Sequence, residues 1–324
     1  MKKRISFVSQ PEYFRFTYEH DLDSIFEVKE FPFNFDMKDK DFEDLILFNA
    51  DYNFFFRGEF FPKETLKKLK GLKIALSSEP FPRKIGNKWE YTKDSIRRYC
   101  AFRSIRNSAF DYIFHYDIAS DPLFKKDKLQ ISGEFAFPVA TNTYKPFDLE
   151  KKWDFFFIGR ATEHRDILFN PLKHRYNFLH IAHGVWGPEL VDYLVRSKIC
   201  LNAHAEPEIS WEPRMQMMLS CGVFVMSEKI TPNKFIRPNI DYIEYNGTKD
   251  LLEKAEYFLK HESERERIAK SGRERILEIL DSRKAFPDLI NKIENGEIPR
   301  FQNRPNGNLF FNLICYLVKR NIIK

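Results

Sequence analysis

The sequence predicts an α/β protein with two Rossmann-like domains that face a cleft, followed by a C-terminal helix. Three observations lead to this class. Short apolar, aromatic-rich runs alternate with helical segments in both halves of the chain, as in open parallel sheets. The 324 residues suffice for two domains at roughly 150 residues each. A Pro-containing stretch without periodicity, 137–151, separates the two alternations. We expect domains over 1–145 and 146–295 and a tail over 296–324.

In the first half, near-continuous apolar runs predict strands that helices cover on both faces. These runs are 5–9, 24–28, 52–56, 73–77 and 112–116, with helices predicted at 41–49, 62–71 and 92–107. Glu79, His115 and Asp117 follow two of these strands, at the edge where ligands bind in such sheets. We expect them to bind an acceptor or to transfer protons. Glu79 could instead cap a turn, and a loop histidine often does no more than hydrogen bond.

The second half repeats the alternation. Its predicted strands are 153–160, 176–184, 199–204, 223–228 and 241–246. The last helix has the clearest pattern, because four residues spaced four apart should share one buried face: Ile268, Gly272, Ile276 and Leu280. The glycine would let that face pack closely against a neighbour.

GRATEHRD (159–166) follows the first strand of the second half. Gly159 allows close backbone approach, and the helix that begins after it offers free amide groups to an anion. Arg160 and Arg165 lie five residues apart across this turn, so both could bind one diphosphate. A solvated pair of arginines at a helix end would explain the same residues.

HGVWGPE (183–189) follows the next strand and predicts a turn. Gly184 and Gly187 allow the backbone conformations that a tight turn needs, and Trp186 lies at the tip of the turn. A Trp in this place could stack on a nucleotide base. Equally, it could close the core of the domain.

The order of elements from Arg196 to Leu280 resembles the donor-binding half of a known enzyme family. RSKICLNAH (196–204) is followed by WEPRMQMMLSCGVFVMSE (211–228) and by ESERERIAKSGRERILEIL (262–280). A strand ending at Asn202, a short helix ending at Gly222, a further strand and two charged helices are similar to the group 1 / family 4-like glycosyltransferases, especially the CgeB-type pattern. The resemblance implies the GT-B fold, a nucleotide-sugar donor, no metal and retention of anomeric configuration.

The resemblance also implies site residues. A Gly-Arg turn followed by a Lys binds the diphosphate in these enzymes, which places Gly159 and Arg160 in that turn and Arg165 at the Lys position. A His near the place of His115 contacts the transferred sugar. The family carries a Glu five residues before the helix-ending glycine, and this chain has Met217 there.

Three explanations for the missing acid stay open. Glu208 and Gln216 keep the family's gap between paired acids, with an amide as the second member. Glu212, at the helix start, could substitute from one turn earlier, or the donor does not require this acid. Arg214 could bind phosphate or form an ion pair with Glu212. For the neighbouring methionines, Met215, Met217 and Met218, core packing is expected for at least two.

We expect a glycosyltransferase that needs no cofactor and no metal and takes a nucleotide sugar as substrate. The acceptor would be a glycan, a lipid-linked sugar or a protein, in synthesis of surface glycans. One alternative is a non-catalytic GT-B homologue that binds nucleotide or carbohydrate. Another is a different sugar enzyme of this fold, such as an epimerase or a phosphorylase.

The cysteines and the chain start predict a cytoplasmic location. Cys100, Cys200, Cys221 and Cys315 show no C-x-x-C spacing, so we expect reduced, buried thiols rather than disulfides. The first residues lack the apolar run of a signal peptide. No run reaches the roughly 18 apolar residues of a membrane-spanning helix.

The tail over 296–324 carries +4 of the net charge of +6. Its helical part is apolar over most of its surface, with Leu309, Phe310, Leu313 and Leu317 before a Lys-Arg end. We expect this helix to pack on the first domain. Otherwise it would lie at the inner face of the cytoplasmic membrane. The rest of the chain carries little net charge, so we expect no nucleic-acid partner.

Overall fold

The computed structural model describes residues 2–19, 22, 26–205, 212–231, 233–302 and 307–320. The chain divides into two compact units. Unit 1 comprises Met1–Phe14, His20–Phe137 and Phe286–Lys324, and unit 2 comprises Arg15–Glu19 and Pro138–Ala285. Apart from the short segment Arg15–Glu19, the chain passes from unit 1 to unit 2 after Phe137, earlier than the expected 145/146.

Two sets of contacts account for these divisions. Val139 N donates to Leu280 O at 2.8 Å and Ala140 N donates to Phe16 O at 2.7 Å, so the segment after Phe137 packs with unit 2. Phe286 packs edge-on against Phe7 and Phe54, at ring centroid distances of 4.9 and 5.1 Å. Residues 286–295, which we expected in the second domain, consequently belong to unit 1.

Unit 1 is built on a six-stranded sheet whose neighbouring strands are all parallel. The spatial order is β2 (Phe26–Pro32), β1 (Lys3–Ser9), β3 (Tyr52–Phe56), β4 (Leu72–Ser77), β7 (Tyr112–His115) and β8 (Gly133–Glu134). The five strands predicted in this half are all present. The sheet order reverses between β1 and β3, which makes that pair the topological switch point of the unit.

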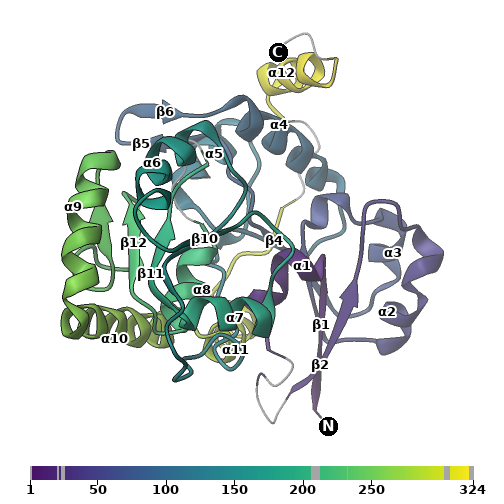
Figure 1. Cartoon of the computed structure of the whole chain (residues 1–324). Coiled ribbons are helices and arrows are strands. Elements are labelled where there is room, and N and C mark those ends of the chain that lie inside the picture. Colours follow the sequence, from purple (N-terminus) through teal and green to yellow (C-terminus); the bar gives the residue numbers. More distant parts are fainter. Residues whose placement is uncertain are drawn as a thin grey trace. The chain divides into compact units, whose positions relative to one another are not determined.

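The helices of unit 1 follow its strands (Figure 1). They are α1 (Pro11–Phe14), α2 (Glu43–Phe48), α3 (Lys63–Lys68), α4 (Lys93–Phe102), α5 (Asp121–Lys126) and α12 (Leu309–Lys319), with 3-10 turns η2 (Asp39–Phe42), η3 (Gly58–Phe60), η4 (Arg103–Asn107) and η5 (Ile118–Ser120). A small antiparallel hairpin, β5 (Arg83–Ile85) and β6 (Lys88–Glu90), was not predicted. Its strands are too short for an alternation of side chains to be visible in the sequence.

Unit 2 contains a five-stranded parallel sheet. The order is β10 (Phe178–Ile181), β9 (Trp153–Ile158), β11 (Ser197–Asn202), β12 (Val225–Glu228) and β13 (Ile243–Tyr245). All five strands lie where the apolar runs predict them. The order reverses between β9 and β11, as in doubly wound folds whose ligand site lies at that point.

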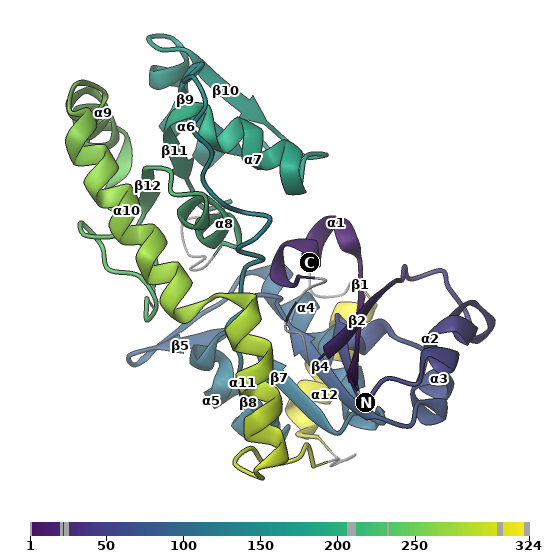
Figure 2. The same ribbon diagram turned by 90° about the horizontal axis from the view of Figure 1, so that it is seen from below.

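Helices cover both faces of the unit 2 sheet (Figures 1 and 2). They are α6 (Glu163–Lys173), α7 (Gly187–Val195), α8 (Arg214–Ser220), α9 (Gly247–Lys260) and α10 (Glu262–Ile279), and α11 (Ser282–Glu294) carries the chain into unit 1. The predicted face of α10 is confirmed, since Ile268, Ile276 and Leu280 are buried. A Cβ on Gly272 would lie 2.4 Å from Asp241 O, so the close approach expected of this glycine is real.

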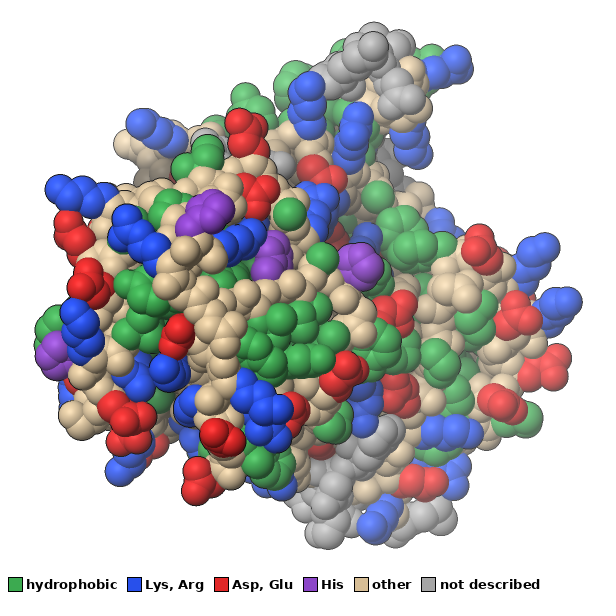
Figure 3. Space-filling view, viewed as in Figure 1, with side chains coloured by type: hydrophobic (Ala, Val, Ile, Leu, Met, Phe, Trp, Pro, Cys, Tyr) green, Lys and Arg blue, Asp and Glu red, His purple; other side chains and the backbone are tan. Residues whose placement is uncertain are grey.

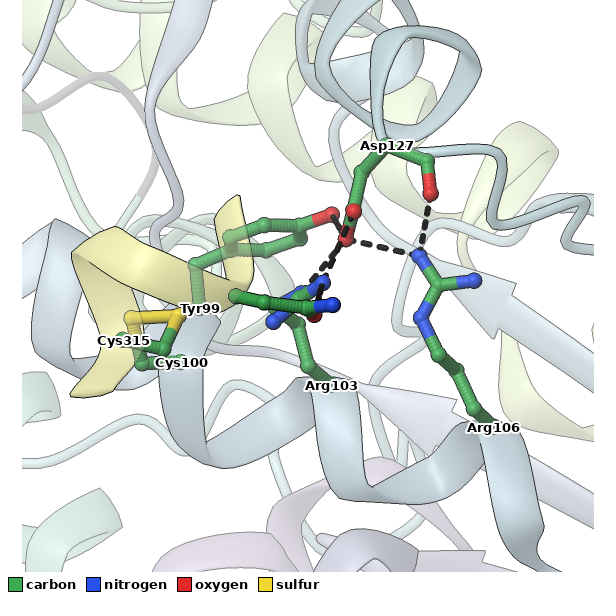
Figure 4. Close-up of a disulfide and its surroundings, with 7 residues drawn as sticks. Tyr99, Cys100, Arg103, Arg106, Asp127 and Cys315 are labelled. Atoms are coloured by element: carbon green, nitrogen blue, oxygen red, sulfur yellow. Dashed lines mark hydrogen bonds and ion pairs between the residues drawn. A yellow bond between two sulfur atoms is a disulfide. The ribbon is translucent and has the colours of Figure 1, made fainter. Parts of the chain in front are cut away.

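The C-terminal helix packs in unit 1, as expected. Phe311 of α12 joins the aromatic core of that unit, and its ring lies 5.9 Å from the ring of Tyr99. Figure 4 shows a disulfide between Cys100 of α4 and Cys315 of α12, with Cα atoms 5.2 Å apart. The prediction of reduced thiols is therefore wrong for this pair and holds for Cys200 and Cys221, which are free and buried.

A buried carboxylate beside the disulfide fixes the same helix (Figure 4). Asp127 accepts from Arg103 Nε at 2.6 Å and from Tyr99 OH at 2.6 Å, pairs with Arg106 at 2.7 Å, and accepts from the backbone N of Asn308 at 3.2 Å. Burial would raise the pKa of Asp127, but these hydrogen bonds lower it below its usual value. Helix α12 is thus held by the hydrogen bond of its N-cap residue to the Asp127 carboxylate as well as by the disulfide.

Among the described residues, no helix is long and apolar enough to span a membrane.

Candidate functional site

The topological switch point of unit 2 brings the ends of β9 and β11 together. Gly159 and Arg160 follow β9, and Ala203 and His204 follow β11. Helix α6 begins just after the first turn, with Thr162 as its N-cap. Gly159, Arg160 and Asn202, three of the residues expected to bind the donor, therefore lie at one edge of one sheet.

Gly159 adopts φ +145°, a conformation that residues with a Cβ rarely adopt. A Cβ on this residue would lie 2.6 Å from Arg214 Nη1 and 3.3 Å from Arg165 Nη1. The glycine therefore lets two guanidinium groups approach the turn. Its expected role in close backbone approach has a physical basis in these contacts.

Arg165 is turned inward rather than toward solvent. Its Nε and Nη2 both donate to Ala203 O, at 3.1 and 2.9 Å, and its Nη1 donates to Arg160 O at 2.8 Å. Burial, aided by the neighbouring positive charge of Arg214, lowers the pKa of Arg165 to about 10. The side chain is 3 % exposed, so it fixes the turn before α6 instead of presenting a charge to solvent.

Arg214 and Arg165 lie against the same ring, Phe157, each with its guanidinium carbon 5.0 Å from the centroid. Arg214 Nη2 forms an ion pair with Glu212 at 2.6 Å, and its Nη1 donates to Ile158 O at 2.5 Å. Of the two roles considered for Arg214, the ion pair with Glu212 is observed. Glu212 also lies 3.6 Å from Arg165 Nη2, and its side chain is 19 % exposed.

Arg160 has the opposite environment. It is exposed, and its guanidinium has no hydrogen-bond or ion-pair partner in the described part of the chain. The amide groups of Glu163 and His164 precede the first hydrogen bond of α6, from Asp166 N to Thr162 O at 2.9 Å, so they are available to a ligand. One uncompensated cation and two free amides thus flank the Gly159 turn.

A His–carboxylate pair at this edge was not predicted. His164 Nε2 lies 2.8 Å from Glu228 Oε1, and the other carboxylate oxygen, Oε2, accepts from His204 N at 2.7 Å. Glu228 ends β12, so the pair links the start of α6 to the ends of β11 and β12. His and Glu at 164 and 228 are distant in sequence, and only the parallel sheet brings them together.

Asn202 lies at the end of β11 and is fully buried. Its Nδ2 donates to Ser227 Oγ at 2.8 Å, while its backbone O accepts from Tyr245 OH at 2.9 Å. Asn202 Oδ1 and, nearby in sequence, His204 Nδ1 are buried without a hydrogen-bond partner in the described residues. Burial lowers the pKa of His204, which favours its neutral form.

The residues considered as replacements for the missing acid on α8 have different environments in the structure. Gln216 is fully buried and donates from Nε2 to Pro138 O at 3.2 Å. Met215 and Met218 are buried, which confirms core packing for two of the three methionines. Glu208 lies outside the described residues, so its role stays a prediction.

Trp186 is 50 % exposed and does not close the core of unit 2. It is the N-cap residue of α7, between Gly184 at φ +89° and Gly187 at φ +58°. Gly187 N donates to Tyr144 OH at 3.1 Å, which anchors the turn. The indole is available to stack on a ligand.

The residues expected in unit 1 have structural partners. Glu79 is held by Arg57, at 2.6 Å, and by Arg98. His115 is 1 % exposed and stacks on Phe81, at a centroid distance of 4.6 Å. Burial lowers the pKa of His115 to about 3, so it is neutral at pH 7. Glu79 follows β4 and His115 is the last residue of β7, both away from the β1/β3 switch point. Their roles in acceptor chemistry stay predictions.

At the switch point of unit 1 lies a residue that sequence reasoning missed. Gln10 follows β1, is 7 % exposed, and its Nε2 is buried without a hydrogen-bond partner among the described residues. Asp117, the third of the residues that the sequence suggested in unit 1, lies 3.6 Å from Arg83. Burial raises the pKa of Asp117.

In the described ranges, no three His, Cys, Asp or Glu side chains are grouped to hold a metal ion.

Comparisons with known proteins agree with this geometry. Residues 150–285 match the family model described as glycosyl transferase-like. No curated protein sequence matches the chain. Solved structures with the same fold include an alpha-glucosyltransferase in complex with UDP-glucose and DNA containing an abasic site, with a TM-score of 0.62 and 11 % identity over 91 % of this chain and 100 % of that one.

Two further structures have the same fold at lower TM-scores. Anabaena HepE in complex with UDP has a TM-score of 0.55 at 9 % identity, covering 91 % of this chain and 100 % of its own. A glycosyltransferase from Rickettsia africae has a TM-score of 0.55 at 12 % identity, covering 91 % and 98 %. The chain has the GT-B fold that the resemblance implied. The CgeB-type pattern within that fold stays a prediction.

Proposed function

We propose that the protein is a glycosyltransferase that moves a sugar from a nucleotide-sugar donor to an acceptor hydroxyl. The observation that carries the proposal is the Gly159 turn at the switch point of unit 2, inside the region that matches the glycosyl transferase-like family. This turn combines free helix-start amides with an exposed, unpaired Arg160 in the described structure. Such a combination suits an anionic leaving group.

In the proposed reaction, Arg160 and the amide groups of Glu163 and His164 stabilise the nucleoside diphosphate as the sugar–phosphate bond breaks. The acceptor hydroxyl attacks the anomeric carbon. Arg165 acts on this step by holding the turn through Arg160 O and Ala203 O. Direct contact between Arg165 and phosphate is not required by this mechanism.

The rest of the donor would be bound by residues flanking this turn. Trp186, half exposed after Gly184, supplies a surface on which the base stacks. Glu212, which Arg214 holds in place, accepts hydrogen bonds from ribose or sugar hydroxyls. Asn202 shapes the floor of the site through its bond to Ser227. We further propose, from the resemblance, retention of configuration and no requirement for metal or cofactor.

The acceptor is proposed to be a glycan, a lipid-linked sugar or a protein, in synthesis of surface glycans. Contact with a membrane surface is part of this proposal. Supporting it, α12 leaves an apolar face uncovered in the described structure, with Leu309 at 82 %, Phe310 and Leu313 at 57 % and Tyr316 at 53 % exposed. Figure 3 shows Lys and Arg side chains near this helix, and α12 has no Asp or Glu.

The cytoplasmic location expected from the sequence stays a proposal with less support. It relied in part on reduced cysteines. Disulfides such as Cys100–Cys315 are typical of oxidising compartments.

One observation favours a second candidate, a non-catalytic homologue that binds nucleotide or carbohydrate. Where the family has an acid on the helix before Gly222, this chain has Met217, and the neighbouring Gln216 points to Pro138 O. Loss of a carboxylate that orients the donor could leave binding without transfer. An epimerase or phosphorylase would rearrange or cleave a sugar without passing it from a nucleotide to an acceptor.

Replacement of Arg160 separates these candidates. Arg160→Ala should abolish release of nucleoside diphosphate from the nucleotide sugar and weaken binding of the diphosphate. Arg175→Ala, an exposed arginine beyond the other end of α6, is the matched control and should change neither. Nucleotide binding without turnover in the wild type would favour the non-catalytic homologue. Turnover that Arg160→Ala leaves intact would contradict the proposed phosphate role.

A further inference from the structure

The His164–Glu228 pair has a geometry that a packing role does not require. His164 is the second residue of α6, in the turn that also presents free amide groups. Its Nε2 is engaged by Glu228 at 2.8 Å, and its Nδ1 has no hydrogen-bond partner in the described residues. The side chain is 26 % exposed, so this second nitrogen can reach a ligand.

Glu228 is itself held rigidly. Its Oε2 accepts from His204 N at 2.7 Å, which leaves Oε1 facing His164. The Glu228 side chain is 14 % exposed. A carboxylate fixed in this way orients the imidazole ring that it contacts, as in other carboxylate–His pairs.

Because Arg165 is buried, no exposed cation stands at the position where the resemblance places a phosphate-binding Lys. At the place where the resemblance puts a phosphate-binding Lys, the guanidinium of Arg165 is buried and bonded to Ala203 O and Arg160 O. The residue immediately before it, His164, is the partly exposed one. The second side chain that reaches a phosphate group beside Arg160 can therefore be His164 instead.

We propose that His164, oriented by Glu228, binds a phosphate oxygen of the donor diphosphate through Nδ1–H, beside Arg160. Glu228 is the positioning residue of this pair. Since no bond to carbon or phosphorus forms at His164, its role is to bind and to neutralise charge as the diphosphate departs. This inference rests on the proposed function, and it assigns the diphosphate contact to a residue outside the Gly-Arg turn.

Titration calorimetry of the full chain with inorganic pyrophosphate tests the proposal. His164→Asn should weaken pyrophosphate binding about tenfold, as expected for one charge-assisted hydrogen bond. The affinity for the nucleoside without phosphate should stay unchanged. His174→Asn, at the other end of the same helix, is the matched control and should bind pyrophosphate as the wild type does.

A structural role for the pair would give a different result. If His164 only joins α6 to β12, His164→Asn lowers the melting temperature and leaves pyrophosphate affinity unchanged, which overturns the proposal. Should His164→Asn fail to fold, the wild type still decides: the ¹⁵N resonance of Nδ1 of His164 must shift when pyrophosphate binds, and an unmoved resonance overturns the proposal.

The same binding measurements distinguish a failure of this inference from a failure of the proposed function. If Arg160→Ala weakens pyrophosphate binding and His164→Asn does not, the donor site stands and only the role of His164 falls. If the wild type binds neither pyrophosphate nor any nucleoside diphosphate, both fall. For Glu228→Gln, which keeps a hydrogen-bonding group but loses the charge, we expect a smaller loss of pyrophosphate affinity than for His164→Asn.

Discussion

Arg165 donates two hydrogen bonds to the carbonyl oxygen of Ala203, from Nε at 3.1 Å and from Nη2 at 2.9 Å. This contact crosses the switch point of the unit 2 sheet and ties the start of α6 to the end of β11. A third bond, to Arg160 O at 2.8 Å, holds the exposed arginine in its place. The proposed phosphate site therefore depends on a residue that solvent barely reaches.

Arg165→Lys should destabilise the protein, because an ammonium group cannot bond the carbonyls of Ala203 and Arg160 in the same planar geometry. We expect a loss of about 2 kcal/mol, the range for hydrogen bonds to a charged group, measured by urea unfolding. Arg175→Ala should stay within about 0.5 kcal/mol, as exposed substitutions do. An unchanged midpoint for Arg165→Lys would show that the guanidinium geometry is not needed.

Gly159→Ala should weaken nucleotide binding and stability together. The added Cβ would lie 2.6 Å from Arg214 Nη1, and the backbone is at φ +145°. Gly184→Ala is the matched control, since its backbone is also at positive φ, at +89°, but a Cβ added there would have no atom within 4 Å. We expect about 1 kcal/mol of strain in the control and at least twice that in Gly159→Ala. Equal losses would contradict the close approach.

Stability should fall between pH 6.5 and pH 3 because of His115. Unfolded, its imidazole takes up a proton near 6.5, whereas burial lowers the pKa in the folded state to about 3. As pH falls below 6.5, the unfolded state alone binds the proton, so the free energy of unfolding decreases, by up to about 2 kcal/mol at pH 5. His115→Phe keeps an aromatic ring on Phe81 and should reduce this decrease, measured as the difference in urea midpoints between pH 7.5 and pH 5. The same pH dependence in both proteins would refute the buried neutral state.

Reduction should loosen the C-terminal helix. The Cys100–Cys315 bond spans 215 residues, and loss of a native disulfide typically costs about 2–4 kcal/mol. We expect a lower melting temperature in reductant and faster amide exchange in α12, and neither change in the Cys100→Ser/Cys315→Ser double variant when reductant is added. Four free thiols in the denatured, unreduced protein, instead of two, would contradict the disulfide.

Binding to anionic vesicles should depend on the exposed face of α12. Leu313→Glu places a charge on that face, where the side chain is 57 % exposed, and should reduce co-sedimentation with anionic vesicles while leaving the fold intact. Leu47→Glu is the control, because Leu47 is 78 % exposed on α2 of the same unit. Equal loss in both variants, or no binding by the wild type, would contradict membrane contact through α12.

The sequence predicted the two sheets because buried parallel strands read as apolar runs, as at Tyr52–Phe56 and Trp153–Ile158. It also predicted Gly159 and Arg160 at a strand end, since a local motif carries that information. It did not predict the inward turn of Arg165. That orientation depends on Ala203 O, 38 residues away.

The remaining differences have the same physical origin. Cys100 and Cys315 meet only because α12 packs on α4, and no spacing rule covers a separation of 215 residues. His164 and Glu228 likewise meet through the order of parallel strands. His115 was expected to serve chemistry because it follows a strand, yet the surrounding rings of Phe81 and Phe124 enclose it.

The most direct test of the donor site is the thermal stability of the purified protein with saturating UDP, GDP, ADP, TDP or CMP, compared with buffer. A ligand at about 100 times its dissociation constant adds about 2.7 kcal/mol to the free energy of unfolding. We expect one nucleoside diphosphate to raise the melting temperature clearly, and the rise to disappear in Arg160→Ala. No rise with any of the five nucleotides would contradict a nucleotide-sugar site at the Gly159 turn.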